Sequence, residues 1–306
     1  MDAQQPRKRR RPGSALLVVV ALFVVGAVVV WPRIAPPRAI GDASAEVIKA
    51  LLAEDWTRVA TLLDTVTPQT PSPVLRLLKA HACLALNRNN ESLGLLLAAS
   101  TDADLQAWHT WTAQLAKRHG TRAVVHYLVG DALARLRQWD SAVGALTDAL
   151  RRHPNDGMAL NARGIAYAAM GNLDEALVDI EEAAKANPSL AEVHTNRGAL
   201  NIQRRLAPEA ALASFRKALE HSPDYVLALN GRGAIGTVLN QFDEAETDLR
   251  RAAELAEGDL GALLPVIVAN GLELARARDA ALANMLARAG GAEPGTEMDV
   301  SYAKNH

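Results

Sequence analysis

Aromatic residues are scarce in this chain of 306 residues, which has five Trp, four Tyr and three Phe. Sheets depend on aromatic and β-branched residues, whereas Ala and Leu are the strongest helix formers. Ala fills 59 positions and Leu fills 43, which together make one third of the chain. The composition therefore favours helices and argues against an all-β sandwich or barrel.

Other residue types are also in short supply. The single cysteine, Cys83, excludes an internal disulfide and a cysteine-rich metal site. Gly and Pro together number 34, too few for a collagen-like or low-complexity chain. The net charge of −1 indicates no polyanionic partner, so we do not expect the chain to bind nucleic acid. Apolar residues at 49% exclude a wholly disordered protein.

One long apolar run lies near the N-terminus, where all 17 residues from Ala15 to Trp31 are apolar or Gly. A helix of this length spans about 25 Å, at the short end of what can cross a hydrocarbon core. Five basic residues precede the run within residues 1–13, and the positive-inside rule places them in the cytoplasm. We predict a basic cytoplasmic arm at 1–13, a transmembrane helix at 14–32 and a Pro-rich linker at 33–42.

A cleaved signal peptide is the alternative for this segment, with Ala43-Ser44-Ala45 as a candidate cleavage site. The apolar run is longer than the usual 7–15 residues of a signal peptide, which favours the uncleaved anchor. The 26 Arg against 7 Lys suggest a bacterial source rich in GC. We therefore expect a single-pass protein of the inner membrane with its bulk in the periplasm, or a soluble periplasmic protein if the segment is cleaved.

The body of the chain repeats with a period of about 34 residues. Glycine recurs at the same point of each unit, and alanine recurs twice after it. These small residues are Gly130, Gly164, Gly198 and Gly233, then Ala142, Ala176, Ala211 and Ala245, then Ala149, Ala183, Ala218 and Ala252. Small residues let two helices cross closely. Each unit therefore reads as two helices joined by a tight turn, and neighbouring units must stack to bury their apolar faces.

This pattern resembles the tetratricopeptide repeat family. The stretch from Leu160 to Tyr167, with Asp174-Glu175-Ala176-Leu177 and Asn187-Pro188 after it, is close to the family consensus. The resemblance implies an α-solenoid of helix-turn-helix repeats. With the transmembrane helix predicted from the apolar run before it, the expected fold class is all-α. The resemblance gives four repeats at 123–156, 157–190, 191–225 and 226–259. We expect degenerate helical repeats at 43–122, a degenerate repeat or capping helices at 260–289, and a flexible tail at 290–306.

The family resemblance also implies a binding groove along the first helices of the repeats. The positions that contact ligands in the family correspond here to Tyr127, Asp131, Met158, Asn161, Ile165, Glu192, Thr195, Asn196, Ile202, Leu227, Asn230 and Thr237. Asparagine amides in such a groove supply a donor and an acceptor for the main chain of a peptide. The cations with which the family grips the tails of chaperones are absent at these positions, so we do not expect that ligand.

No catalytic, cofactor or metal site is predicted, and the chain is not expected to be an enzyme. Gly231 to Gly236 match the glycine-rich dinucleotide motif, but they lie within a predicted helix and not after a strand. Arg163 and Arg232 precede crossing glycines, and Asp179 and Asp248 recur in the second helices of the same repeats. This joint presence predicts salt bridges within repeats.

The sequence thus predicts a membrane-anchored scaffold or adaptor that binds a partner peptide or helix in its groove. By analogy with bacterial proteins of this plan, it would assist assembly of an envelope complex. The alternative is a self-associating structural oligomer, whose groove is filled by the tail or by the degenerate N-terminal helices of a second copy.

Overall fold

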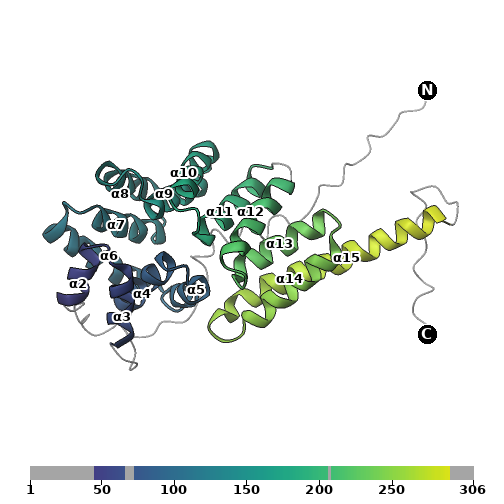
Figure 1. The fold of residues 1–306 in the computed structure, drawn as a ribbon, viewed down its shortest axis with the longest axis horizontal. Coiled ribbons are helices and arrows are strands. Elements are labelled where there is room, and N and C mark those ends of the chain that lie inside the picture. The colour runs from purple at the N-terminus through teal and green to yellow at the C-terminus, as the bar shows by residue number, and fades with distance from the viewer. Residues whose placement is uncertain (1–44, 66–71, 206–207, 290–306) are drawn as a thin grey trace.

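The computed structural model describes residues 45–65, 72–205 and 208–289, and in these residues every regular element is helical. Fourteen α-helices and one 3-10 helix follow one another in this part of the chain (Figure 1). The all-helical repeat array expected from the sequence is therefore present. The predicted arm at 1–13, the transmembrane helix at 14–32, the linker at 33–42 and the tail at 290–306 lie outside the described residues.

Four helical hairpins form the centre of the array. Their first helices are α7 (Ala123–Arg135), α9 (Gly157–Met170), α11 (Ala191–Gln203) and α13 (Val226–Val238). Their second helices are α8 (Trp139–Arg152), α10 (Leu173–Ala186), α12 (Pro208–His221) and α14 (Phe242–Leu255). A Cβ atom on Gly164 would lie 2.8 Å from Ile180, and one on Gly233 would lie 2.7 Å from Leu249. The crossing role predicted for these glycines is confirmed, because only a hydrogen atom fits at that point.

The salt bridges predicted within repeats are also present. Arg163 donates from Nε and Nη2 to the two carboxylate oxygens of Asp179, both at 2.7 Å. Arg232 makes the same paired contact with Asp248, both at 2.6 Å. These planar, two-point contacts join the first helix of a repeat to its second helix.

Within residues 45–122, the described part of the chain before the hairpins contains α2 (Ala45–Leu52), α3 (Trp56–Thr65), α4 (Pro73–Ala85), α5 (Asn89–Leu97) and α6 (Asp102–His119). Helix α6 packs on α7 and extends the array, and its Trp108 and Trp111 are buried. Helices α4 and α5 form a hairpin at 73–97, which we call the α4–α5 hairpin. Figure 1 shows its α5 end beside α11 and α13, far along the chain.

Two asparagines fix the α4–α5 hairpin to the repeats. Asn87 Oδ1 accepts from the Ala191 amide at 3.1 Å, and Asn90 Oδ1 accepts from the Val226 amide at 3.1 Å. These amides belong to the first residues of α11 and α13, whose own N-cap residues make no side-chain hydrogen bond. Helix α9, in contrast, is capped by Asp156 from its own sequence. Since the first amides of a helix need an acceptor, the hairpin supplies caps that the repeats lack.

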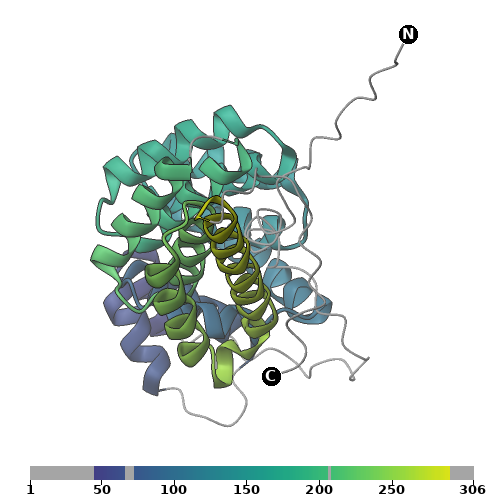
Figure 2. The same cartoon turned by 90° about the vertical axis from the view of Figure 1, so that its right-hand side faces the viewer.

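The C-terminal end of the array is a 3-10 helix, η1 (Gly258–Leu263), followed by the long α15 (Leu264–Ala289). Residues 260–289, where a degenerate repeat or capping helices were expected, thus form part of η1 and one continuous helix. Helix α15 packs on α13 and α14 and then projects beyond them, toward the viewer in Figure 2. Among the described residues, the helical stretch Gly258–Met285 is long and apolar enough to cross a membrane by length and composition.

Candidate functional site

The twelve predicted groove residues all lie on the first helices α7, α9, α11 and α13, and the structure divides them into two groups. One group lines two adjoining cavities beneath the α4–α5 hairpin: Tyr127, Asp131, Met158, Asn161, Ile165, Glu192, Asn196 and Leu227. The other group lines neither cavity: Thr195, Ile202, Asn230 and Thr237. The first-helix face is therefore covered in part by the chain itself.

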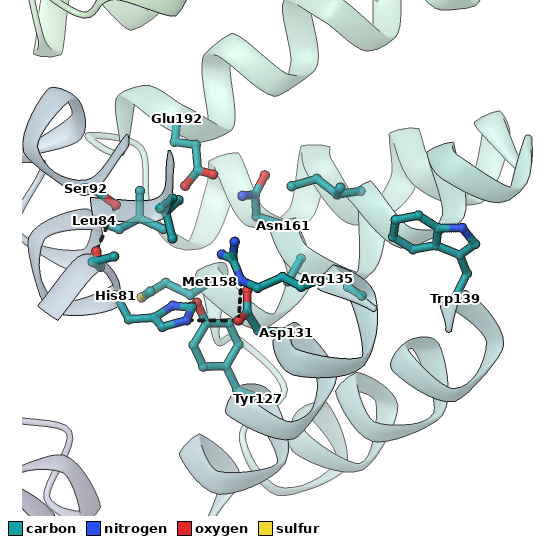
Figure 3. Close-up of a pocket in the computed structure, with 15 residues that line it drawn as sticks. His81, Leu84, Ser92, Tyr127, Asp131, Arg135, Trp139, Met158, Asn161 and Glu192 are labelled. Carbon is teal, nitrogen blue, oxygen red and sulfur yellow. Dashed lines mark hydrogen bonds and ion pairs between the residues drawn. The ribbon is translucent and has the colours of Figure 1, made fainter. Parts of the chain in front are cut away.

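The first cavity has a volume of about 190 Å³ and lies between the hairpin and helices α7, α9 and α11. We call it the Arg135 cavity. Leu84 and Leu96 of the hairpin form one wall, and Met158 and Ile165 of α9 form another. Figure 3 shows Arg135, Glu192 and Asn161 around the same space, so an apolar chamber carries a few polar groups. Such a balance is typical of binding pockets.

Asp131 is the centre of a buried polar cluster at the floor of this cavity (Figure 3). Its Oδ2 accepts from Arg135 Nε at 2.8 Å and from Trp108 Nε1 at 2.9 Å, and it lies 3.1 Å from His81 Nε2. The other ring nitrogen of His81 lies 2.8 Å from the Tyr127 hydroxyl. Burial opposes the charged carboxylate, but Arg135 and His81 outweigh it and hold the pKa of Asp131 well below its ordinary value.

Arg135 and Glu192 have hydrogen-bonding capacity that the described residues do not use. Arg135 donates from Nε to Asp131, and its two Nη groups make no hydrogen bond to any described residue. Glu192 Oε2 is shielded from solvent and also has no hydrogen-bond partner there. Burial raises the pKa of Glu192 to about 7, because Arg135 and Asn196 compensate only part of the desolvation. A donor and an acceptor thus face the same cavity unpaired.

The second cavity, of about 180 Å³, continues beneath α5 toward η1. It shares Arg135, Ile165 and Glu192 with the first, and it adds Asn196, Leu227 and other residues of α5 and α11–α13. A chain segment that entered the Arg135 cavity would therefore find a second apolar space next to it.

The groove asparagines are engaged in packing. Asn196 Nδ2 donates to Asn161 Oδ1 at 2.9 Å, and Asn270 Nδ2 donates to Asn230 Oδ1 at 2.8 Å. The first pair joins α11 to α9, which are first helices of neighbouring repeats. The second pair joins α15 to α13, so α15 takes the place of the next first helix. Asn230 is 1% exposed, so in this conformation a partner cannot reach it.

Sequence reasoning did not identify His81, Trp108 and Arg135 as members of the site. Arg135 stands four residues beyond Asp131, the last predicted groove residue on α7, where the helix brings its side chain back over the cavity. His81 and Trp108 come from helices α4 and α6, outside the four clear repeats. Burial together with the shared carboxylate of Asp131 identifies them, and no local motif does.

The described residues contain no group of three or more His, Cys, Asp or Glu that could hold a metal ion. The motif-like Gly231 to Gly236 lie inside α13, as the sequence indicated. The site is therefore described by its hydrogen-bonding groups and apolar walls.

Comparisons with known proteins agree with the repeat assignment. A family model described as tetratricopeptide repeat matches residues 127–191 and 203–259. Hsp70-Hsp90 organizing protein 3 of Arabidopsis thaliana is 26% identical over 102 residues, which cover 33% of this chain and 18% of that protein. The Hsp70-Hsp90 organizing protein of Triticum aestivum is 22% identical over 213 residues, which cover 68% of this chain and 35% of that protein. The matches thus span about a third or less of these relatives.

Among solved structures, the thermophilic TPR protein TTC0263 of Thermus thermophilus has a TM-score of 0.49 with 22% sequence identity. That similarity covers 61% of this chain and 98% of TTC0263. The 34-residue period, the crossing glycines and the family match over residues 127–191 and 203–259 lead to one conclusion. The helical hairpins over residues 127–191 and 203–259 are tetratricopeptide repeats.

Proposed function

We propose that this protein is an interaction scaffold that binds a segment of a partner protein in the Arg135 cavity. The observation that carries the proposal is the pair of unused groups there, the Arg135 Nη donors and the Glu192 Oε2 acceptor. The Glu192 oxygen is buried without a partner, which costs free energy, so a ligand that donates to it and also accepts from the partly exposed Arg135 gains affinity.

The chemistry of the two groups favours a peptide group as the ligand. A peptide group offers one acceptor and one donor, and its carbonyl suits Arg135 while its N–H suits Glu192. The Asp131–Arg135 pair is already neutral, so an uncharged ligand group leaves the charge balance unchanged. A volume of about 190 Å³ is small for a pocket, which suits one apolar anchor side chain of a partner.

The α4–α5 hairpin forms the outer wall of the site, so the partner segment enters where this hairpin moves. The hairpin is held on the repeats by the Asn87 and Asn90 side chains, by the contacts of His81 with Tyr127 and Asp131, and by the packing of α5 on η1. Helix α4 also packs on α6. The names of the curated relatives describe proteins that organize Hsp70 and Hsp90, which is consistent with a protein as the partner class.

A photocrosslinking experiment tests this function. A benzophenone amino acid at Leu84, which lines both cavities, should crosslink one partner from the native host. The same probe at Val178, which is 61% exposed on α10, is the matched control. The proposal fails if both positions capture the same set of proteins.

A cavity-filling variant tests whether capture by the Leu84 probe depends on the cavity itself. Ile165→Trp should reduce capture from Leu84 because its side chain occupies the cavity, whereas Val178→Trp should leave capture unchanged. Circular dichroism of both variants checks that the helical array is retained.

We further propose that residues 14–32 anchor this scaffold in the inner membrane, with the repeats in the periplasm and a role in assembly of an envelope complex. The support is the apolar run from Ala15 to Trp31 and the basic arm before it. A C-terminal alkaline phosphatase fusion should be active in this topology, and an inactive fusion contradicts it. N-terminal sequencing of the purified protein distinguishes the anchor from a cleaved signal peptide.

A further inference from the structure

The C-terminal helix α15 occupies the place of a first helix in a fifth repeat. The Asn270–Asn230 hydrogen bond repeats the Asn196–Asn161 bond between neighbouring first helices. This register makes Val268 the fourth residue and Leu272 the eighth residue of the unit. In the preceding repeats these positions face the second helix, since His194 stacks on His221 and the eighth-position glycines lie against side chains of the second helix.

On α15 the same face has no covering helix among the described residues. Val268 is 54% exposed and Leu272 is 55% exposed, although large apolar residues at these positions belong in a helix interface. A Cβ atom built on Gly271 would meet nothing within 4 Å. An open groove of about 410 Å³ runs between α14 and α15 beside this face. The fifth unit thus has a first helix and a vacant groove.

The exposed face continues along the projecting half of α15 with coiled-coil spacing. Val268, Leu272, Ala275, Asp279 and Leu282 follow one another at intervals of four and three residues, and all five are exposed. The opposite face carries the buried residues Ile267, Asn270 and Leu274. A 4-3 spacing keeps one seam facing one partner helix over several turns. The seam therefore fits a helix, and a helix of matching spacing is α15 itself.

We propose that α15 pairs antiparallel with α15 of a second copy of this chain. Centred on Ala277, the pairing places Leu272 opposite Leu282 of the other copy, and Ala275 opposite Asp279. The projecting half of each α15 then lies along the vacant groove of the other array and serves as the missing second helix. Such a twofold interface is self-complementary, as closed dimers require.

The charges on α15 select this arrangement over two others. In a parallel pair, Asp279 would face Asp279 of the other copy, whereas the antiparallel register places it near Arg276 and Arg278. Arg276 pairs with Glu273, and Arg278 pairs with Asp243 and Glu246, but both side chains stay more than half exposed and can also approach this carboxylate. The same charges near the middle of α15 make insertion of this half into a membrane costly.

Site-directed disulfide formation in the full chain tests the register. A chain with Leu272→Cys and a differently tagged chain with Leu282→Cys should form a mixed disulfide when they are expressed together. Each variant alone should form little, because equivalent residues lie about 15 Å apart along the helix axis in this register. The native Cys83 is buried and does not interfere. Val178→Cys is the control for random collisions, because that site is equally exposed on another helix.

Light scattering provides the second measurement. The full chain should have the mass of a dimer, and Leu272→Glu with Leu282→Glu should weaken association at least about a hundredfold. Both side chains are more than half exposed, so these changes should leave the melting temperature of the array unchanged at high dilution. Val178→Glu should leave the dimer intact.

A monomeric wild-type chain overturns the proposal, whether its own residues 290–306 or lipid cover the seam. Disulfides formed as readily by Leu272→Cys alone overturn the antiparallel register. Either result would leave the proposed binding of a partner in the Arg135 cavity untouched, because partner capture from Leu84 does not depend on α15.

Discussion

The two asparagine caps supplied by the α4–α5 hairpin lead to a quantitative prediction. Asn90→Ala removes the acceptor for the first amide of α13, and Asn87→Gly removes the acceptor for the first amide of α11. Glycine is chosen at 87 because that residue has φ of 60°, where alanine would add strain. A lost cap costs about 1 kcal/mol, so the double variant should lose about 2 kcal/mol of the free energy that holds the hairpin closed.

Hydrogen exchange measures this loss directly. A change of about 2 kcal/mol raises the population of the open hairpin about thirtyfold, so amides of α4 and α5 should exchange about thirtyfold faster. The amides of Ala191 and Val226 should also lose protection because their acceptors are gone. Urea unfolding of the array should show a smaller change if the hairpin opens separately from the repeats.

Two controls separate hairpin release from general destabilisation. Asn240→Gly changes the same residue type at the same φ of 60°, in a turn that does not involve the hairpin. Asp156→Ala removes the cap that α9 receives from its own sequence. Neither should accelerate exchange in α4 or α5. The reasoning is refuted if the double variant leaves exchange in the hairpin unchanged, or if Asp156→Ala accelerates it equally.

Four further substitutions concern the repeats and the cavity. Gly164→Ala should destabilise the array by about 1–3 kcal/mol in thermal unfolding, because the new Cβ would lie 2.8 Å from a side chain of α10. Gly144→Ala, where the space is open, should instead stabilise it by up to about 1 kcal/mol. Asp179→Asn should cost about 2 kcal/mol in urea unfolding, since Arg163 loses a charged partner, and equal stability would contradict the role of the pair. The pKa of Glu192 is raised from 4.5 to about 7, so the folded state holds its proton and stability falls as pH rises from 4.5 to 7. Glu192→Gln should therefore gain up to about 3 kcal/mol at pH 8 and little at pH 5, and equal gains at both pH values would contradict the assignment.

Local sequence was sufficient to predict the repeat array. The crossing glycines, the turns and the Arg163–Asp179 and Arg232–Asp248 pairs all connect helices that are neighbours in the chain. Each unit packs on the next in the same way, so the residues that make these contacts recur every 34 residues and can be recognised in the sequence. The positions of the first-helix residues followed from the same period.

The composition of the Arg135 cavity could not be predicted from that period. Asn87 meets residues 102 to 134 positions away, and Asn90 meets residues 134 and 136 positions away. These contacts depend on how the small rotation from one repeat to the next accumulates along the array. The groove residues were then predicted on the correct helices, but the hairpin above them and the pairing of their amides decide which of them a partner can reach.

The sequence by itself therefore determined the class of fold and the order of the helical hairpins, because both rest on short-range periodicity. Only the tertiary structure decided that the α4–α5 hairpin caps α11 and α13. It also decided that, among the described residues, Arg135 and Glu192 face one cavity without partners for all their polar atoms and one face of α15 has no covering helix. Each of these features arises where helices from distant parts of the chain meet or fail to meet. Their geometry is fixed by the superhelix as a whole, and no single repeat contains it.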